Sequence, residues 1–353
     1  MKKIFVAMLA LAAATACSND ELVSVNQEAI GFDNAFINNS VRSVETPGYS
    51  TAKIFDDFAV YGFVEGASLF NGVKVSKNGS GLDADKYAGQ TSTSWKYEGT
   101  QYWIAGADYK FYAVAPMTNG GWSVKTGTTP LDSGATLSFT TTNGTQDLLY
   151  APIVERPGAL QGNVAVAFTF QHILSKVKFS FKNGYNASAA TICVRDIKIT
   201  NANESGEVAL AKTAATWSNQ SSSTIEIAFG NATTEETYAT DATEANFVNY
   251  DYAYDTTVES YYERLLIPGN KEWNISFVVE LLVSGQKIDE YEHTAKATID
   301  FQPGHSYDIN AEITASNIDP GHAQEPIEFT ATMTDWSAAE DKNATINNNT
   351  ANN

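Results

Sequence analysis

Histidines and paired acidic residues are the side chains in this sequence that could bind a metal or carry out acid–base chemistry. The four histidines are His172, His293, His305 and His322. None has a second metal-binding residue at the spacing of a motif such as H-E-x-x-H, and Asp83 and Asp85 lack the other ligands and the glycine of a calcium loop. No nucleophile elbow, Walker loop or dinucleotide fingerprint occurs either. We therefore expect no catalytic residue, no metal site, no cofactor and no enzymatic activity.

Two residues with reactive side chains fall inside alternating patterns that predict strands. His172 lies in FTFQHILSKVKFSF, where we expect a hydrogen-bonded structural histidine rather than a catalytic base. Cys193 lies in TICVRDIKIT, where we expect a small buried side chain. Since the only other cysteine, Cys17, is expected to be modified, we expect no disulfide.

Cys17 ends an N-terminal segment with the features of a signal peptide. A basic start, an uncharged apolar run from Ile4 to Ala14 and small residues before the cysteine predict that residues 1–16 are removed. The run is shorter than the roughly 20 residues of a membrane-spanning helix. Cys17 resembles the lipobox cysteine of bacterial lipoproteins, and the acidic residues after it resemble a surface-export signal, so we expect a lipid anchor in the outer membrane. An ordinary secretory signal with an incidental cysteine is the alternative.

The charge balance indicates which partners the chain does not bind. Lys and Arg number 22 against 41 Asp and Glu, which gives a net charge of -19. We therefore expect no binding to nucleic acid or to anionic lipid headgroups. Aromatic residues make up 12% of the chain and charged residues only 18%, a balance that favours extended sheet surfaces.

Strict alternation of apolar and polar residues recurs along the chain and predicts strands with one buried face. The clearest apolar faces are those of KVKFSFK (Val177, Phe179, Phe181), WNISFVVELLV (Trp273 to Leu281), YDINAEI (Tyr307 to Ile313) and IEFTATM (Ile327, Phe329, Ala331, Met333). In the first half, FDDFAVYGFV, DYKFYAVAP and TLSFT are separated by clusters of turn-forming residues. We expect an all-β protein built from β-sandwiches.

Proline and glycine interrupt this pattern at APIVERPGALQGN, residues 151–163. We therefore expect one domain over residues 43–160 and a second over residues 161–336. The polar tail, residues 337–353, has too few apolar residues to fold alone, and we expect it to be disordered or ordered only by a partner.

A tyrosine-rich and acidic segment, Asn246 to Leu265, is an unusual stretch of expected surface. Its tyrosines include Tyr250, Tyr252, Tyr254, Tyr261 and Tyr262. Exposed tyrosines beside carboxylates can stack on and hydrogen-bond a host glycan or protein ligand. A pair of acidic strands with packed tyrosines explains the same spacing without a ligand. Both interpretations remain open.

Several local patterns occur in an order that resembles the fimbrillin family, in its Mfa-like branch of type V pilus subunits. They are EAIGFDNAFINNSVRS, WKYEGTQYWIAGADYKFYAVAP, DLLYAP, FTFQHILSKVKFSF, LLIPG, FQPGHSYDI and IEFTATMTDW, which together span about Glu28 to Trp336. The resemblance implies two tandem transthyretin-like, Greek-key β-sandwich domains. It also implies a lipoprotein precursor that polymerises with other pilus subunits by strand exchange, after an arginine-specific protease removes the N-terminal segment.

The sequence predicts a short N-terminal strand with one apolar face. This face would hold Ile30, Phe32 and Phe36, which are separated by even numbers of residues. Arg42 follows in the polar stretch NNSVRSVETPGYS, which suits an accessible loop. We therefore expect the lipidated segment 17–42 to be removable by a cut between Arg42 and Ser43. A solvated surface arginine is the alternative.

The donor of the replacing strand is expected at the other end of the chain. Ile327, Phe329, Ala331 and Met333 form a matching apolar face, and a sheet edge left open by the lost strand would bind it readily. An ordinary last strand is the alternative. The sequence departs from the family pattern after Trp336, where relatives continue with an apolar strand. A permanently anchored adhesin or glycan-binding lipoprotein that does not polymerise therefore remains the second hypothesis, and a hydrolase is a distant third.

Overall fold

The structure is a computed structural model of the chain. It describes residues 28–37, 56–90, 94–118, 120–125, 135–159, 162–184, 191–210, 215–218, 220–229, 239–240, 248–249, 263–284, 286–317, 327–335, 341–344 and 346–348. Cys17, Arg42, Ser43 and the tyrosines of segment 246–265 lie outside these residues. No helix long and apolar enough to cross a membrane occurs in the part of the chain that is described.

The described chain is built almost entirely of strands, which confirms the all-β prediction. The strands of the first half are β1 (Phe32–Ile37), β2 (Asp57–Val64), β3 (Ala67–Lys77), β4 (Trp95–Tyr97), β5 (Asp108–Ala115), β6 (Trp122–Val124), β7 (Thr136–Thr140), β8 (Leu149–Pro157) and β9 (Val166–His172), with one short 3-10 helix, η2 (Ala84–Lys86). The strands of the second half are β10 (Ser175–Asn183), β11 (Thr191–Asn203), β12 (Ser205–Ala209), β13 (Thr216–Ser218), β14 (Thr224–Phe229), β15 (Ala239–Thr240), β16 (Val248–Asn249), β17 (Arg264–Leu266), β18 (Gly269–Val283), β19 (Gln286–Phe301), β20 (His305–Ile313), β21 (Phe329–Asp335), β22 (Asp341–Ala344) and β23 (Ile346–Asn348).

The first half closes into a barrel with the strand order β1-β4-β3-β2-β5-β8-β9, in which β9 pairs back with β1. An apolar cluster fills its interior, with Phe32, Phe58, Phe70, Phe111 and Phe168 among its fully or almost fully buried side chains. Closure removes free sheet edges, so every strand of the barrel has two neighbours.

The apolar residues of β2 and β5 are buried on both faces of the barrel wall. Phe58 and Val60 face the barrel interior, while Ala59 and Tyr61 belong to a second apolar cluster outside it. The four-stranded sheet β13-β12-β7-β6 contributes Leu137 and other residues to this outer cluster. Two buried faces explain why FDDFAVYGFV and DYKFYAVAP are almost continuously apolar rather than alternating.

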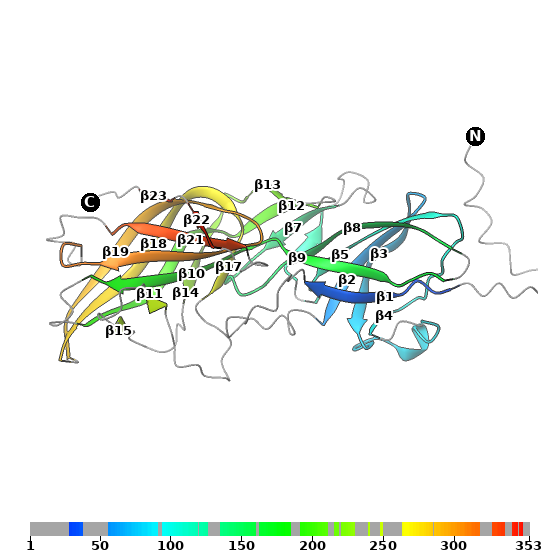
Figure 1. Ribbon diagram of the computed structural model, residues 1–353, viewed down its shortest axis with the longest axis horizontal. Coiled ribbons are helices and arrows are strands. Elements are labelled where there is room, and N and C mark those ends of the chain that lie inside the picture. The colour runs from blue at the N-terminus through cyan, green and yellow to red at the C-terminus, as the bar shows by residue number, and fades with distance from the viewer. Residues whose placement is uncertain are drawn as a thin grey trace, which may run out of the picture.

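The second half has two main sheets that enclose one apolar core. Their strand orders are β16-β10-β20-β21-β22 and β14-β11-β18-β19-β23. The predicted faces of β10, β18 and β20 are buried as the alternation indicated, and Trp273 of this core is fully buried. Figure 1 shows the barrel and this two-sheet half end to end along the long axis of the molecule.

The division between the two halves differs from a single cut at residue 160. Strand β9 follows that residue, yet it pairs with β1 and β8 in the barrel. Strand β7 precedes it, yet it pairs with β12 over five residues. Residues 151–157 of the proline- and glycine-containing segment are part of β8, and the segment does not separate the packed layers, because the outer cluster draws side chains from both sides of it.

The tail also differs from the prediction. Residues 341–344 form β22, which pairs with β21 at the edge of one main sheet, and residues 346–348 form β23, which pairs with β19 at the edge of the other. Edge strands are stabilised by ladder hydrogen bonds on one side, so they form without an apolar pattern of their own.

Candidate functional site

The N-terminal strand β1 occupies a slot between β4 and β9. Phe32 pairs with Trp95 of β4 in antiparallel orientation and with Val166 of β9 in parallel orientation. Figure 1 shows β1 lying along β9 at the end of the molecule where the N-terminus is located. Without β1, the remaining order β4-β3-β2-β5-β8-β9 would have two open edges facing the same gap, which is a template for another strand.

Backbone hydrogen bonds hold the start of this segment on both sides. The Ile30 N–H donates to the Gln101 carbonyl at 2.8 Å, and the Trp103 N–H donates to the Glu28 carbonyl at 3.0 Å. On the opposite side the Val166 N–H donates to the Gly31 carbonyl at 2.8 Å. The segment therefore completes the ladder of the barrel before β1 itself begins.

The side chains of Ile30 and Phe32 fill the barrel core, and both are 0% exposed. The Phe32 ring lies edge-on to Tyr97 and Phe70, with centroids 5.4 Å and 5.5 Å apart, and stacks on Phe168 at 5.8 Å. Burial of each of these two side chains stabilises the folded state by about 1.5 to 3 kcal/mol. The predicted apolar face is therefore confirmed for Ile30 and Phe32.

The backbone register changes between Phe32 and the third residue of the predicted face. Asp33 pairs with Ala167, but Phe36 pairs with Thr169, so one extra residue is inserted in β1. Such a bulge shifts the alternation by one position. The structure therefore confirms the predicted face for Ile30 and Phe32, and the placement of Phe36 on it stays a prediction.

Glu28 fastens the segment to the loop before β9. Its carboxylate accepts hydrogen bonds from the Gly162 N–H at 2.8 Å, from the Asn163 N–H at 2.6 Å and from the Asn163 side-chain amide at 2.9 Å. These donors favour the ionised form and hold the pKa of Glu28 below its ordinary value. The sequence offers no signal for this contact, because Glu28 and Gly162 are 134 residues apart.

The predicted donor residues lie in the second half of the molecule. Ile327, Phe329 and Ala331 are buried, and the partly buried Met333 packs against the same core. Strand β21 pairs with β20 over seven residues and with β22 over four. The predicted apolar face is confirmed. The structure does not bring it next to β1, because the two strands belong to different sheets.

The two reactive side chains that we expected to be structural are both buried, and His172 is also hydrogen-bonded. His172 Nδ1 lies 2.7 Å from Asp147 Oδ2, and both side chains are 7% exposed. Cys193 is 2% exposed, and burial together with the nearby Glu280 raises its thiol pKa to about 11. Among the residues that the structure describes, no three metal-binding side chains come together.

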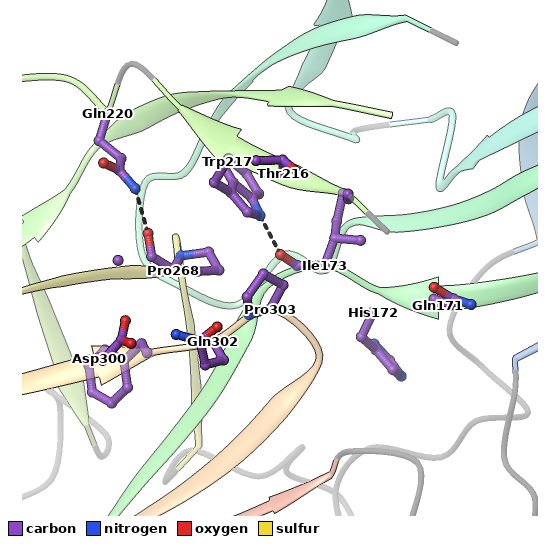
Figure 2. A pocket seen from close by; sticks show the side chains of 13 residues that line it. Gln171, His172, Ile173, Thr216, Trp217, Gln220, Pro268, Asp300, Gln302 and Pro303 are labelled. Carbon is purple, nitrogen blue, oxygen red and sulfur yellow. Dashed lines mark hydrogen bonds between the residues drawn. The ribbon is translucent and has the colours of Figure 1, made fainter. Parts of the chain in front are cut away.

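A cavity of about 470 Å³ lies where the two halves meet. Its walls come from residues 171–173 at the end of β9, residues 215–217 and Gln220 around β13, residues 268–269 at the start of β18, and residues 300–303 at the end of β19 and in the turn that follows it. Figure 2 shows the Trp217 indole N–H directed at the Ile173 carbonyl and the Gln220 amide at the Pro268 carbonyl.

Comparison with known proteins identifies similar sequences and folds. A family model described as fimbrillin-like matches residues 51–336. A fimbrial protein from Bacteroides vulgatus ATCC 8482 has a similar structure, with a TM-score of 0.57 and 15% identity over 87% of this chain and 99% of the other. A protein from Bacteroides uniformis ATCC 8492, provisionally assigned to cell adhesion, has a TM-score of 0.46 and 15% identity over 89% of this chain and 99% of the other. No curated protein matches the sequence.

Proposed function

Because the chain belongs to the fimbrillin-like family, we propose that it is the precursor of a fimbrial subunit, exported as a lipoprotein and assembled at the cell surface. In this proposal residues 1–16 are removed, Cys17 carries the lipid and the anchored precursor folds outside the cell. The role is structural and adhesive rather than enzymatic, and its partners are other subunits, an arginine-specific protease and the outer membrane.

One observation carries the proposal: the barrel is closed by β1, and the chain connects β1 to the rest of the barrel only through residues 38–55. A cut between Arg42 and Ser43, inside that connection, would leave β1 held by noncovalent contacts alone. These are the ladder hydrogen bonds, the Glu28 contacts and the burial of Ile30 and Phe32. Another strand that makes the same contacts could then replace it.

An incoming strand would have the same neighbouring strands and side chains as β1. It would run parallel to β9 and antiparallel to β4, as β1 does. It would place apolar side chains against Phe70, Tyr97 and Phe168. Ladder hydrogen bonds would supply affinity, and the pockets left by Ile30 and Phe32 would fix the register.

We assign the donor to the C-terminal strand with Ile327, Phe329, Ala331 and Met333. Donation requires that β21 leave the core of its own subunit, where Phe329 lies edge-on to Phe179 and Phe277 at 6.3 Å and 6.1 Å. Burial of the same side chains in the neighbouring barrel would offset this loss. The edge strands β22 and β23 each follow β21 and would move with it.

Treatment of the purified protein, carrying Cys17→Ser so that no lipid is attached, with an arginine-specific protease tests the proposal. We expect a new N-terminus at Ser43 and oligomers that sediment and resist SDS. The matched variant Arg42→Lys keeps the charge and should stay uncut and monomeric. Stable monomers after a clean cut would contradict strand exchange and would fit a permanently anchored adhesin.

A further inference from the structure

The cavity between the two halves is built from residues outside the slot of β1, and we propose that it is a binding site for a neutral saccharide. Among the described residues that line it, only Gln171 and His172 belong to the barrel strands, at the end of β9. Its volume of about 470 Å³ lies within the roughly 300 to 1,000 Å³ of small-ligand sites. The size suits a mono- or disaccharide.

Trp217 provides a rigid aromatic surface in the wall of this cavity. Its indole N–H donates to the Ile173 carbonyl at 2.6 Å, and Phe139 packs edge-on against it at 6.1 Å. A Cβ at position 206 would lie 3.2 Å from the Trp217 ring, which is a tight contact, so the ring packs closely against the backbone of Gly206. The ring is half-buried and lines the cavity. A fixed aromatic face attracts the polarised C–H groups of a sugar ring.

Polar side chains around Trp217 match the hydroxyl groups of a sugar. Within the described residues, the side chains of Gln171, Gln302 and Asp300 make no hydrogen bond. Gln220 donates from Nε2 to the Pro268 carbonyl at 2.8 Å, which fixes the orientation of its amide and leaves its carbonyl oxygen as an acceptor. Amides both donate and accept, and a carboxylate accepts, so Gln220, Gln302 and Asp300 can bind several hydroxyl groups. Figure 2 shows Gln302 and Asp300 on one side of the cavity with Pro268 and Trp217 nearby, whereas Gln171 lies on the opposite side of the view, beyond Ile173 and His172.

The charge of the lining indicates a neutral ligand. Neither lysine nor arginine is among the described residues that line the cavity, while Asp300 supplies a carboxylate. Phosphate, sulfate and carboxylate ligands need cationic partners to offset their desolvation. The chain as a whole also carries a net charge of -19. An acidic saccharide or a phosphorylated ligand is therefore disfavoured relative to a neutral hexose or N-acetylhexosamine.

Saturation-transfer NMR with the intact, uncut protein tests this site. The probes are glucose, galactose, mannose, N-acetylglucosamine, lactose, sialic acid and a proline-rich peptide, each at concentrations on the order of 10 mM. We expect transfer to at least one neutral saccharide, weakened about tenfold or more by Trp217→Ala. Gln302→Ala should weaken it by about threefold or more. Because the Gln302 side chain makes no hydrogen bond in the described structure, this variant keeps the fold intact.

Trp122→Ala is the matched control. Trp122 is also half-buried and donates its indole N–H to a carbonyl, that of Pro116 at 2.7 Å, but it lies on β6 at the other edge of the same four-stranded sheet. The Trp122→Ala variant should bind the saccharide as tightly as the unmodified protein does. Binding to no neutral saccharide, binding unchanged by the Trp217 and Gln302 variants, or tighter binding of sialic acid or the peptide would each overturn the proposal. The assay needs no cleavage, so its outcome is independent of strand exchange.

Discussion

The Tyr97 hydroxyl donates a 2.8 Å hydrogen bond to the backbone carbonyl of Ile30 inside the barrel core. The same hydroxyl accepts a hydrogen bond from the Gln101 N–H at 3.1 Å. Burial raises the pKa of Tyr97, so the hydroxyl keeps its proton and remains a donor throughout the physiological range. Because Tyr97 belongs to β4, this donor stays in the slot when β1 leaves and is available to a replacing strand.

Replacing Tyr97 by Phe should loosen the N-terminal segment without emptying the core. The ring stays, but the Ile30 carbonyl and the Gln101 N–H lose a partner, which costs about 1 to 3 kcal/mol of unfolding free energy. Hydrogen exchange of residues 28–32 should become faster. Tyr109→Phe is the control, because Tyr109 accepts from the Ile104 N–H at 2.7 Å in the same core. It should lower stability without selectively releasing residues 28–32, and equal exchange in both variants would contradict this role for Tyr97.

Replacing Phe32 by Ala should destabilise the intact chain but not the processed one. Loss of a fully buried phenylalanine costs about 3 to 5 kcal/mol of unfolding free energy. After a cut at Arg42 and dissociation of β1, the barrel no longer contains residue 32, and its denaturation midpoint should match that of the equally treated unmodified protein. Phe329→Ala serves as the comparison. Because Phe329 lies in the core of the second half, its replacement should destabilise both the intact and the processed form. A Phe32→Ala effect that persists after processing would show that β1 stays bound.

The N-terminal segment should be held less strongly at acid pH, because Glu28 becomes protonated there. Its pKa is lowered from 4.5, chiefly by the hydrogen bonds from Gly162 and Asn163. Because the pKa of Glu28 is lower in the folded state than its ordinary value of 4.5, the ionised carboxylate stabilises the fold at neutral pH. This contribution of Glu28 is lost as the pH falls below 4.5 and through the folded-state pKa. In an NMR titration the amide protons of Gly162 and Asn163 should shift with a midpoint below 4.5. Glu28→Gln should abolish the shift, and a midpoint at or above 4.5 would contradict the geometry.

Alternation along single strands was sufficient to predict much of the second half. The period of two places Val177, Phe179 and Phe181 on one face, and all three are buried. The same argument predicted the buried faces that begin at Ile30 and Ile327. These predictions succeed because the pattern of a strand against one core depends on neighbouring residues alone.

Features that depend on contacts between distant segments could not be predicted in the same way. The bulge in β1 that shifts Phe36 is set by the partner strand β9. The Glu28 contact and the cavity around Trp217 each join segments far apart in the chain. The tail strands β22 and β23 form because sheet edges are present, whereas their own sequence has no strand pattern.

A synthetic peptide of residues 28–37 should restore the barrel of the processed protein. It carries Glu28, Ile30 and Phe32, which supply the loop contacts and the two buried side chains, so it should raise the melting temperature and block oligomer formation. The same peptide with Phe32→Asp should do neither, because it would place an unpaired carboxylate in the aromatic core. A peptide of residues 327–335 should compete for the same slot if β21 is the donor, whereas its Phe329→Asp form should not. Rescue by residues 28–37 without competition by residues 327–335 would confirm the slot and place the donor elsewhere in the chain.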